Sequence, residues 1–126
     1  MIDLVCPFFD TYKHFLTTIQ YLLQYYNFQN DYTDCDSIVL KSSDKFPGTS
    51  LQEISQAGVP QQKLVLGKPG LPIDVTNGGY LPPDTLADCL KMGKEIGWDG
   101  GVMAWQYPDA DANWIKQVRS KSWPVQ

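Results

Sequence analysis

The chain has 126 residues, of which 43% are hydrophobic and 19% are charged, so it is expected to be one globular domain with a modest core rather than a disordered chain. Its net charge of −4 argues against binding to nucleic acid or to an anionic membrane surface, because such binding relies on basic patches.

The amino-terminal part of the chain predicts two strands and a short helix. Residues 2–7 are an apolar run that ends at Pro7, and they predict a buried strand. Residues 10–16 predict a short helix with Asp10 as its cap. Residues 19–26 are rich in aliphatic and aromatic side chains, which is typical of a strand.

A long polar loop and a helix are expected next. Residues 27–45 predict the loop, with a short strand at 37–40. The segment Ser50–Glu53 fits a capping box, in which a hydroxyl and a carboxylate satisfy each other's backbone donors. Gly58 is expected to end this helix. Its apolar face would be formed by Leu51, Ile54 and Ala57.

The rest of the chain alternates strands and helices. Residues 63–67 predict a third strand, and residues 101–105 predict a fourth. Between them, a helix begins near Pro83 or Asp84 and ends at Gly97. Its apolar positions are Leu86, Cys89, Leu90, Gly93 and Ile96, and a last helix over residues 110–120 buries Trp114, Ile115 and Val118.

This alternation predicts an α/β fold with a parallel sheet. The apolar strands agree, because parallel strands are buried on both faces. The long loops follow strands, whereas the turns from helix to strand are short. That asymmetry is typical of barrels in which functional loops lie at the carboxyl ends of the strands.

Two predicted strand ends stand out together, namely Leu23–Asn27 and Gly100–Trp105. They resemble segments of the family 18 glycoside hydrolases, the chitinases and endo-β-N-acetylglucosaminidases. Leu23–Asn27 is similar to the sixth-strand segment of that family, and Gly100–Trp105 resembles its eighth strand. Phe46–Ser50 and Lys63–Pro69 fit the intervening segments of fungal-type members. Cys6–Asp10 resembles the end of strand five.

The resemblance implies that residues 1–126 are a partial catalytic domain, namely strands five to eight of a (β/α)8 TIM barrel. A complete barrel takes about 250 residues. The family's acid motif, Asp-x-x-Asp-x-Asp-x-Glu on strand four, would then lie outside this chain. In the family its Glu protonates the glycosidic oxygen, while the preceding Asp positions the substrate's own N-acetyl group as nucleophile. No catalytic residue is therefore assigned here.

One acidic segment of this chain matches that motif in part. Asp31–Ile38 matches three of its acidic positions but has Ile38 in place of the acid, and it follows a polar loop rather than an apolar strand. Without a carboxylic acid at that position, no proton is offered to a leaving group. We interpret the segment as a solvated acidic loop.

The resemblance assigns substrate binding to Gln24, Tyr26, Asn27 and Trp105. Alternation along a strand lets Gln24 and Tyr26 share one face while Tyr25 points to the helices. In the family, the matching Gln and Tyr hydrogen-bond the acetamido group of the sugar, and the Trp stacks beneath its apolar face. Asn27 would shape the rim or serve as a turn residue.

Two further residues and the remaining site chemistry stay open. Tyr107 and Asp109 would line the rim, although helix capping explains Asp109 equally well. The sequence contains no Cys/His cluster of the kind that binds zinc, and no cofactor is expected. His14 is interpreted as an ordinary surface or helix residue. The three cysteines Cys6, Cys35 and Cys89 leave their pairing and the redox compartment undecided.

Three hypotheses follow for the function, and whether the chain is an enzyme stays open. The first is a fragment of a chitinase-like hydrolase, inactive alone, whose ligand is chitin or N-acetylglucosamine oligosaccharides. The second is a noncatalytic carbohydrate-binding or inhibitor-like relative. The third is a half-barrel that self-associates through its open sheet edges.

The sequence also bears on localisation and on membranes. No apolar run reaches the about 20 residues that a membrane-spanning helix needs. Met1–Val5 lacks the features of a signal peptide, and no Asn-x-Ser/Thr sequon occurs. An extracellular location is therefore implied by the family resemblance alone.

Overall fold

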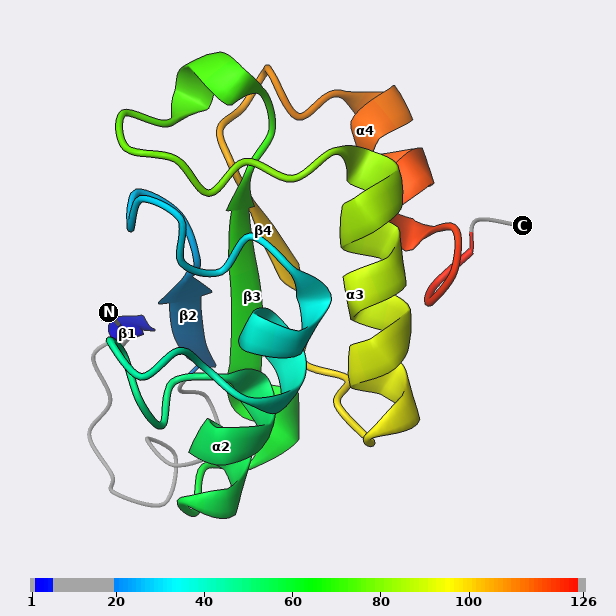
Figure 1. Cartoon of the computed structure of the whole chain (residues 1–126). Helices are drawn as coiled ribbons and strands as arrows, with labels where there is room; N and C mark the ends of the chain where they lie inside the picture. The colour runs from blue at the N-terminus through cyan, green and yellow to red at the C-terminus, as the bar shows by residue number, and fades with distance from the viewer. Residues whose placement is uncertain (1, 6–19, 125–126) are drawn as a thin grey trace, which may run out of the picture.

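Four strands form one sheet in the order β1–β2–β3–β4 (Figure 1). The computed structural model describes residues 2–5 and 20–124, and of β1 it describes the backbone. The strands are β1 (Ile2–Val5), β2 (Gln20–Gln24), β3 (Leu64–Pro69) and β4 (Val102–Trp105). Together with the helices they make an α/β fold, as the sequence predicted.

The three strands β2, β3 and β4 run parallel, which confirms that part of the predicted sheet. Leu23 lies opposite Leu66, and Leu66 lies opposite Val102. The first strand differs, because β1 pairs antiparallel with β2, with Ile2 opposite Leu23. The prediction of a parallel first strand is therefore wrong, since an apolar run encodes burial and not the direction in which a strand pairs.

Three helices have the expected places, namely α2 (Leu51–Gln56), α3 (Pro83–Glu95) and α4 (Ala112–Arg119). The capping box of α2 is confirmed, because Ser50 Oγ accepts the Glu53 amide and Glu53 Oε2 accepts the Ser50 amide. Gly58 follows the end of α2 with φ +112°, and Gly97 follows α3 with φ +93°. Glycine tolerates these left-handed conformations without a steric penalty, which is why each helix ends there.

The core lies between the sheet and the helices. Helices α3 and α4 run side by side beside the sheet, as Figure 1 shows. Trp114 and Val118 of α4 are buried as expected, but Ile115 is 45% exposed and Ala57 is exposed at the end of α2. The fully buried aliphatic centre comprises Leu23, Leu64, Leu66, Leu86 and Leu90.

The predicted short strand at 37–40 is wrong, since Asp36–Leu40 is a π-helical turn, η1. Asp34 starts this turn by accepting the Ser37 amide at 2.8 Å. Ile38 and Val39 are fully buried within it. A short apolar run predicts burial but does not distinguish a strand from a helical turn, and here the local Asp side chain decides.

A disulfide joins this loop to a helix, because Cys35 at the start of η1 is bonded to Cys89 of α3. The two cysteines are 54 positions apart in sequence. A crosslink over such a span typically contributes about 2–4 kcal/mol by restricting the unfolded chain. The predicted helix at 10–16, together with Cys6 and His14, lies outside the described residues.

Among residues 2–5 and 20–124, no helix is both long and apolar enough to cross a membrane.

Candidate functional site

The parallel part of the sheet has two faces with different side chains. Leu23 and Tyr25 are buried in the core, as are Leu64 and Leu66, so these positions define the helix face. Because side chains alternate along a strand, the residues between them point the other way, and we call this side the second face. It carries Gln24 of β2, Gly67 of β3, and Met103 and Trp105 of β4.

Register brings the side chains of the second face into rows. Gln24 lies opposite Gly67, and Gly67 lies opposite Met103. A Cβ built on Gly67 would come within 2.9 Å of Met103 Cε, so the Met103 side chain lies over the glycine. Trp105 lies two residues further along β4, opposite Pro69. With neighbouring strands about 4.8 Å apart, the Cα atoms of Gln24 and Trp105 are roughly 12 Å apart.

Trp105 is accessible at the carboxyl end of β4. Its side chain is 46% exposed, whereas Trp98 and Trp114 are buried. Its carbonyl accepts the Gly70 amide at 2.6 Å, and the following peptide bond to Gln106 is cis. The loops after β2, β3 and β4 all leave the sheet at this same end, the upper end in Figure 1.

Tyr26 and Asn27 begin the loop after β2. Tyr26 is 7% exposed, and Gly79 packs on it so closely that an added Cβ would lie 2.6 Å from Tyr26 Cα. Tyr25 is fully buried, with its hydroxyl donating to Thr49 O at 2.7 Å, so it belongs to the core as predicted. Gln24, at the end of β2, is half-buried.

Asn27 connects the loop after β2 to the loop after β3. It adopts φ +66°, and its Oδ1 accepts the backbone amides of Thr76 and Asn77 at 2.9 and 3.0 Å. Its own amide donates to Gly78 O at 2.8 Å. These bonds give Asn27 the role of a turn residue that holds a second loop, and direct sugar contact by Asn27 stays a prediction.

The acidic segment 31–38 is engaged in local structure. Asp31 accepts a hydrogen bond from Ser43 Oγ and lies 3.8 Å from Lys45 Nζ. Ile38, the residue at the position of the missing acid, is fully buried in the core. The segment therefore presents no carboxylic acid at that position.

The carboxyls of Asp74 and Asp109 are hydrogen-bonded to each other. Asp74 lies in the loop after β3 and Asp109 in the loop after β4, and the sequence did not predict this pair. That bond, with burial, raises the pKa of the Asp109 carboxyl. Burial also acts to raise the pKa of Asp74, but hydrogen bonds from the Leu71 amide, Asp109 and Gln106 lower it below its usual value. Of the two carboxyls, Asp109 is therefore the one that takes up a proton first as the pH falls.

The structure excludes the helix-cap alternative for Asp109. The cap of α4 is Asp111, whose Oδ1 accepts the Trp114 amide at 2.9 Å. Asp109 lies in the loop before it, next to Tyr107, whose side chain is 90% exposed. Asp109 is thus not the helix cap, and its place at the rim of a sugar site stays a prediction.

Lys68 is the functional candidate that sequence reasoning missed. It lies in β3 opposite Ala104, and its side chain is fully buried. Its Nζ donates to the carbonyl oxygens of Tyr25, Tyr32 and Gly79 at 2.6, 2.7 and 2.8 Å. One signal in the sequence could have found it, namely a lysine inside the apolar run of a predicted buried strand. Lysine is almost never fully buried unless it is partnered, so such a lysine indicates buried acceptors around it.

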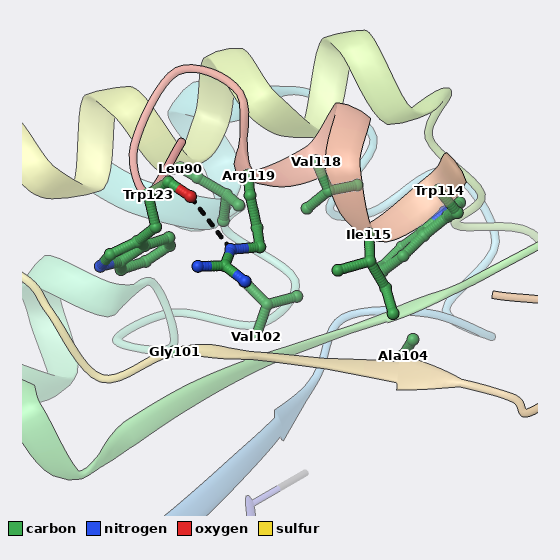
Figure 2. A pocket seen from close by; sticks show the side chains of 9 residues that line it. All are labelled: Leu90, Gly101, Val102, Ala104, Trp114, Ile115, Val118, Arg119 and Trp123. Atoms are coloured by element: carbon green, nitrogen blue, oxygen red, sulfur yellow. Dashed lines mark hydrogen bonds between the residues drawn. The ribbon is translucent and has the colours of Figure 1, made fainter. Parts of the chain in front are cut away.

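A groove of about 410 Å3 runs between β4 and α4 on the helix face (Figure 2). Val102, Ala104 and Ile115 line it, and Trp123 closes one end. Arg119 Nε donates to Trp123 O at 3.0 Å across that end. The groove is largely apolar and lies on the opposite face of the sheet from Trp105, so it is separate from the predicted sugar site.

Within the described part of the chain, no three His, Cys, Asp or Glu side chains gather in a way that could hold a metal ion. Comparisons with models of protein families, with curated proteins and with solved structures found no match to this chain.

Proposed function

We propose that the chain binds N-acetylglucosamine oligosaccharides on the second face of its sheet and that it represents part of a (β/α)8 barrel of the family 18 glycoside hydrolase type. The observation that carries the proposal is Trp105, a 46% exposed indole at the carboxyl end of a parallel strand. Its accessible ring suits stacking beneath the apolar face of a sugar. The sequence resemblance supplies the sugar class.

The neighbours of Trp105 support a polar contribution to the same site. Gln24 ends the strand two away in the sheet, on the same face, and Tyr26 follows it by two residues. An amide and a phenol give directional hydrogen bonds without a competing charge, which suits an acetamido group. Gly67 lies between Gln24 and Met103 in the register, and the Met103 side chain covers it, so the floor between the two strand ends is apolar.

The barrel assignment rests on β2, β3 and β4, which correspond to strands six to eight of the resemblance. β1 departs from that pattern, because barrel strands pair in parallel and β1 pairs antiparallel. This sequence contains no Asp-x-x-Asp-x-Asp-x-Glu. We therefore propose binding without hydrolysis by this chain, which suits both an inactive fragment of a hydrolase and a noncatalytic relative.

An extracellular location is part of the same proposal. The family resemblance implies it, and the Cys35–Cys89 disulfide supports it, because disulfides persist in oxidising compartments.

Titration with tetra-N-acetylchitotetraose tests the binding proposal. Trp105→Ala is expected to weaken binding at least about tenfold, since lost stacking costs on the order of 1.4 kcal/mol. Ile115→Ala is the matched control, because Ile115 is 45% exposed but lines the groove on the other face. The proposal fails if the native chain does not bind the tetramer, or if both variants lose affinity equally.

Self-association is a second candidate, favoured by the edge of the sheet. In the described residues β4 pairs with β3 alone, so its other edge leaves backbone groups unpaired beside an apolar groove. Such an edge favours strand addition, and we propose a strand from a second copy as the occupant.

Light scattering after gel filtration tests this association. The expected mass is twice the chain mass of 14.2 kDa, and Ile115→Glu is expected to reduce it to the monomer mass by placing a charge in the groove. A native chain that stays monomeric at every concentration would contradict the candidate.

A further inference from the structure

The three carbonyls that Lys68 holds belong to two different loops. Tyr25 and Tyr32 lie in the segment that follows β2, whereas Gly79 lies in the segment that follows β3. A lysine ammonium has three N–H donors, so all of its donors are used here. The side chain of one strand residue therefore connects two loops at the carboxyl end of the sheet.

The connected carbonyls flank Tyr26. Tyr25 is its immediate neighbour, and Gly79 packs against the Tyr26 backbone, with φ +95° at the glycine. Beyond Tyr26, the Asn27 amide donates to Gly78 O, and the Gln29 amide donates to Asn77 O at 2.8 Å. The backbone on both sides of Tyr26 is thus tied to the neighbouring loop.

A cation suits this position for a physical reason. Three carbonyl oxygens that converge on one point repel one another unless a group with several donors lies between them. Methionine has a similar length and apolar stem but offers no donor, so it would leave the three carbonyls unpartnered. Burial lowers the pKa of the Lys68 ammonium to about 7, and Asp34 acts to raise it.

We propose that Lys68 is a positioning residue, whose ammonium fixes the loop after β2 against the loop after β3 and thereby sets Tyr26 at the sugar site. This inference rests on the proposed function for its link to sugar binding. The loop connection itself is independent of any ligand. Lys68 acts through Tyr26 and the two loops, because its own side chain is fully buried on the helix face.

Amide exchange measured by NMR on the native chain and on Lys68→Met tests the connection. The amides of Asn27 and Gln29 are expected to exchange at least about tenfold faster in the variant, because the carbonyls lose their shared donor. The Leu66 amide, which donates to Gly101 O at 3.0 Å in the sheet, should change little. Lys63→Met is the matched control, since Lys63 lies immediately before the same strand and is partly exposed.

Sugar binding gives a second readout. Lys68→Met is expected to lose about tenfold in affinity for tetra-N-acetylchitotetraose, whereas Lys63→Met should bind as the native chain does. Lys68→Arg, which restores donors, should recover part of both the exchange protection and the affinity. Unchanged exchange at Asn27 and Gln29 in Lys68→Met overturns the inference. Failure of the native chain to bind the sugar refutes the proposed function and leaves the exchange result to decide the role of Lys68.

The native chain offers a measurement that does not depend on a folded variant. At a pH well below 7, where Lys68 is charged, a held ammonium should give a slowly exchanging Nζ–H signal, and saturating tetramer should shift it, because the ligand contacts the residues that Lys68 positions. A Lys68 signal that exchanges as fast as those of surface lysines would overturn the inference, as would one that saturating sugar leaves unmoved.

Discussion

The core and the second face of the sheet use tryptophan in opposite ways. Trp98 is 1% exposed, its Nε1 donates to Leu64 O at 2.7 Å, and its ring fills the space over Gly93. Trp105 belongs to the second face and is 46% exposed. The difference shows that aromatic content alone does not indicate a binding surface, because one indole is used for packing and the other is left accessible.

The largest effect expected from this comparison is on stability. Trp98→Ala should lower the free energy of unfolding by about 3–5 kcal/mol, because it leaves a cavity and an unpartnered carbonyl. Trp105→Ala should lower it by about 1 kcal/mol or less, since the indole is already half in water. Urea denaturation of both variants measures this. Equal losses would show that Trp105 packs as a core residue and would contradict the difference between the two tryptophans.

A smaller loss in the free energy of unfolding is expected when the cap of α2 is changed. Burial acts to raise the pKa of the Glu53 carboxyl, but hydrogen bonds from Ser42 and Ser50 outweigh it and lower the pKa to about 2. Because the unfolded pKa is near 4.5, the stability from this carboxylate is present above about pH 4.5 and is lost as the pH falls toward 2.

Glu53→Gln tests this cap. We expect a loss of about 1–2 kcal/mol near neutral pH and a flatter stability profile between about pH 2 and 4.5. Glu95→Gln is the control, because Glu95 pairs with Lys91 at 3.9 Å on the surface and such pairs contribute little. Sugar affinity should stay unchanged in both variants near neutral pH. A Glu53→Gln profile that falls with acid as steeply as the native one would contradict the assignment.

Local signals predicted much of the helix side of the molecule. The Ser50–Glu53 capping box and the glycines at 58 and 97 specified where α2 and α3 begin or end, because these signals act within a few residues. The same kind of reasoning failed for residues 37–40. There an apolar run was compatible with two structures, and the hydrogen bonds of Asp34 selected the helical turn.

The candidate site was predictable only in part. Strand alternation predicted one face for Gln24 and Tyr26, whereas only the register between strands shows that Trp105 shares the face of Gln24. The pairing of Asp74 with Asp109 could not be foreseen, because it joins two loops that are far apart in the sequence. The role of Asn27 likewise depends on backbone amides about 50 positions away.

The sequence by itself determined the alternation of β2, β3 and β4 with α2, α3 and α4, the capping box of α2, the glycines that follow α2 and α3, and the residues that carry the family resemblance. These depend on hydrophobic spacing and on capping, which are properties of short segments. The tertiary structure decided the antiparallel pairing of β1, the partner of Cys35 and the burial of Lys68 among three carbonyls. Each of these depends on which distant segments meet, and a chain folds to satisfy buried polar groups with whatever partners the packed core brings within reach.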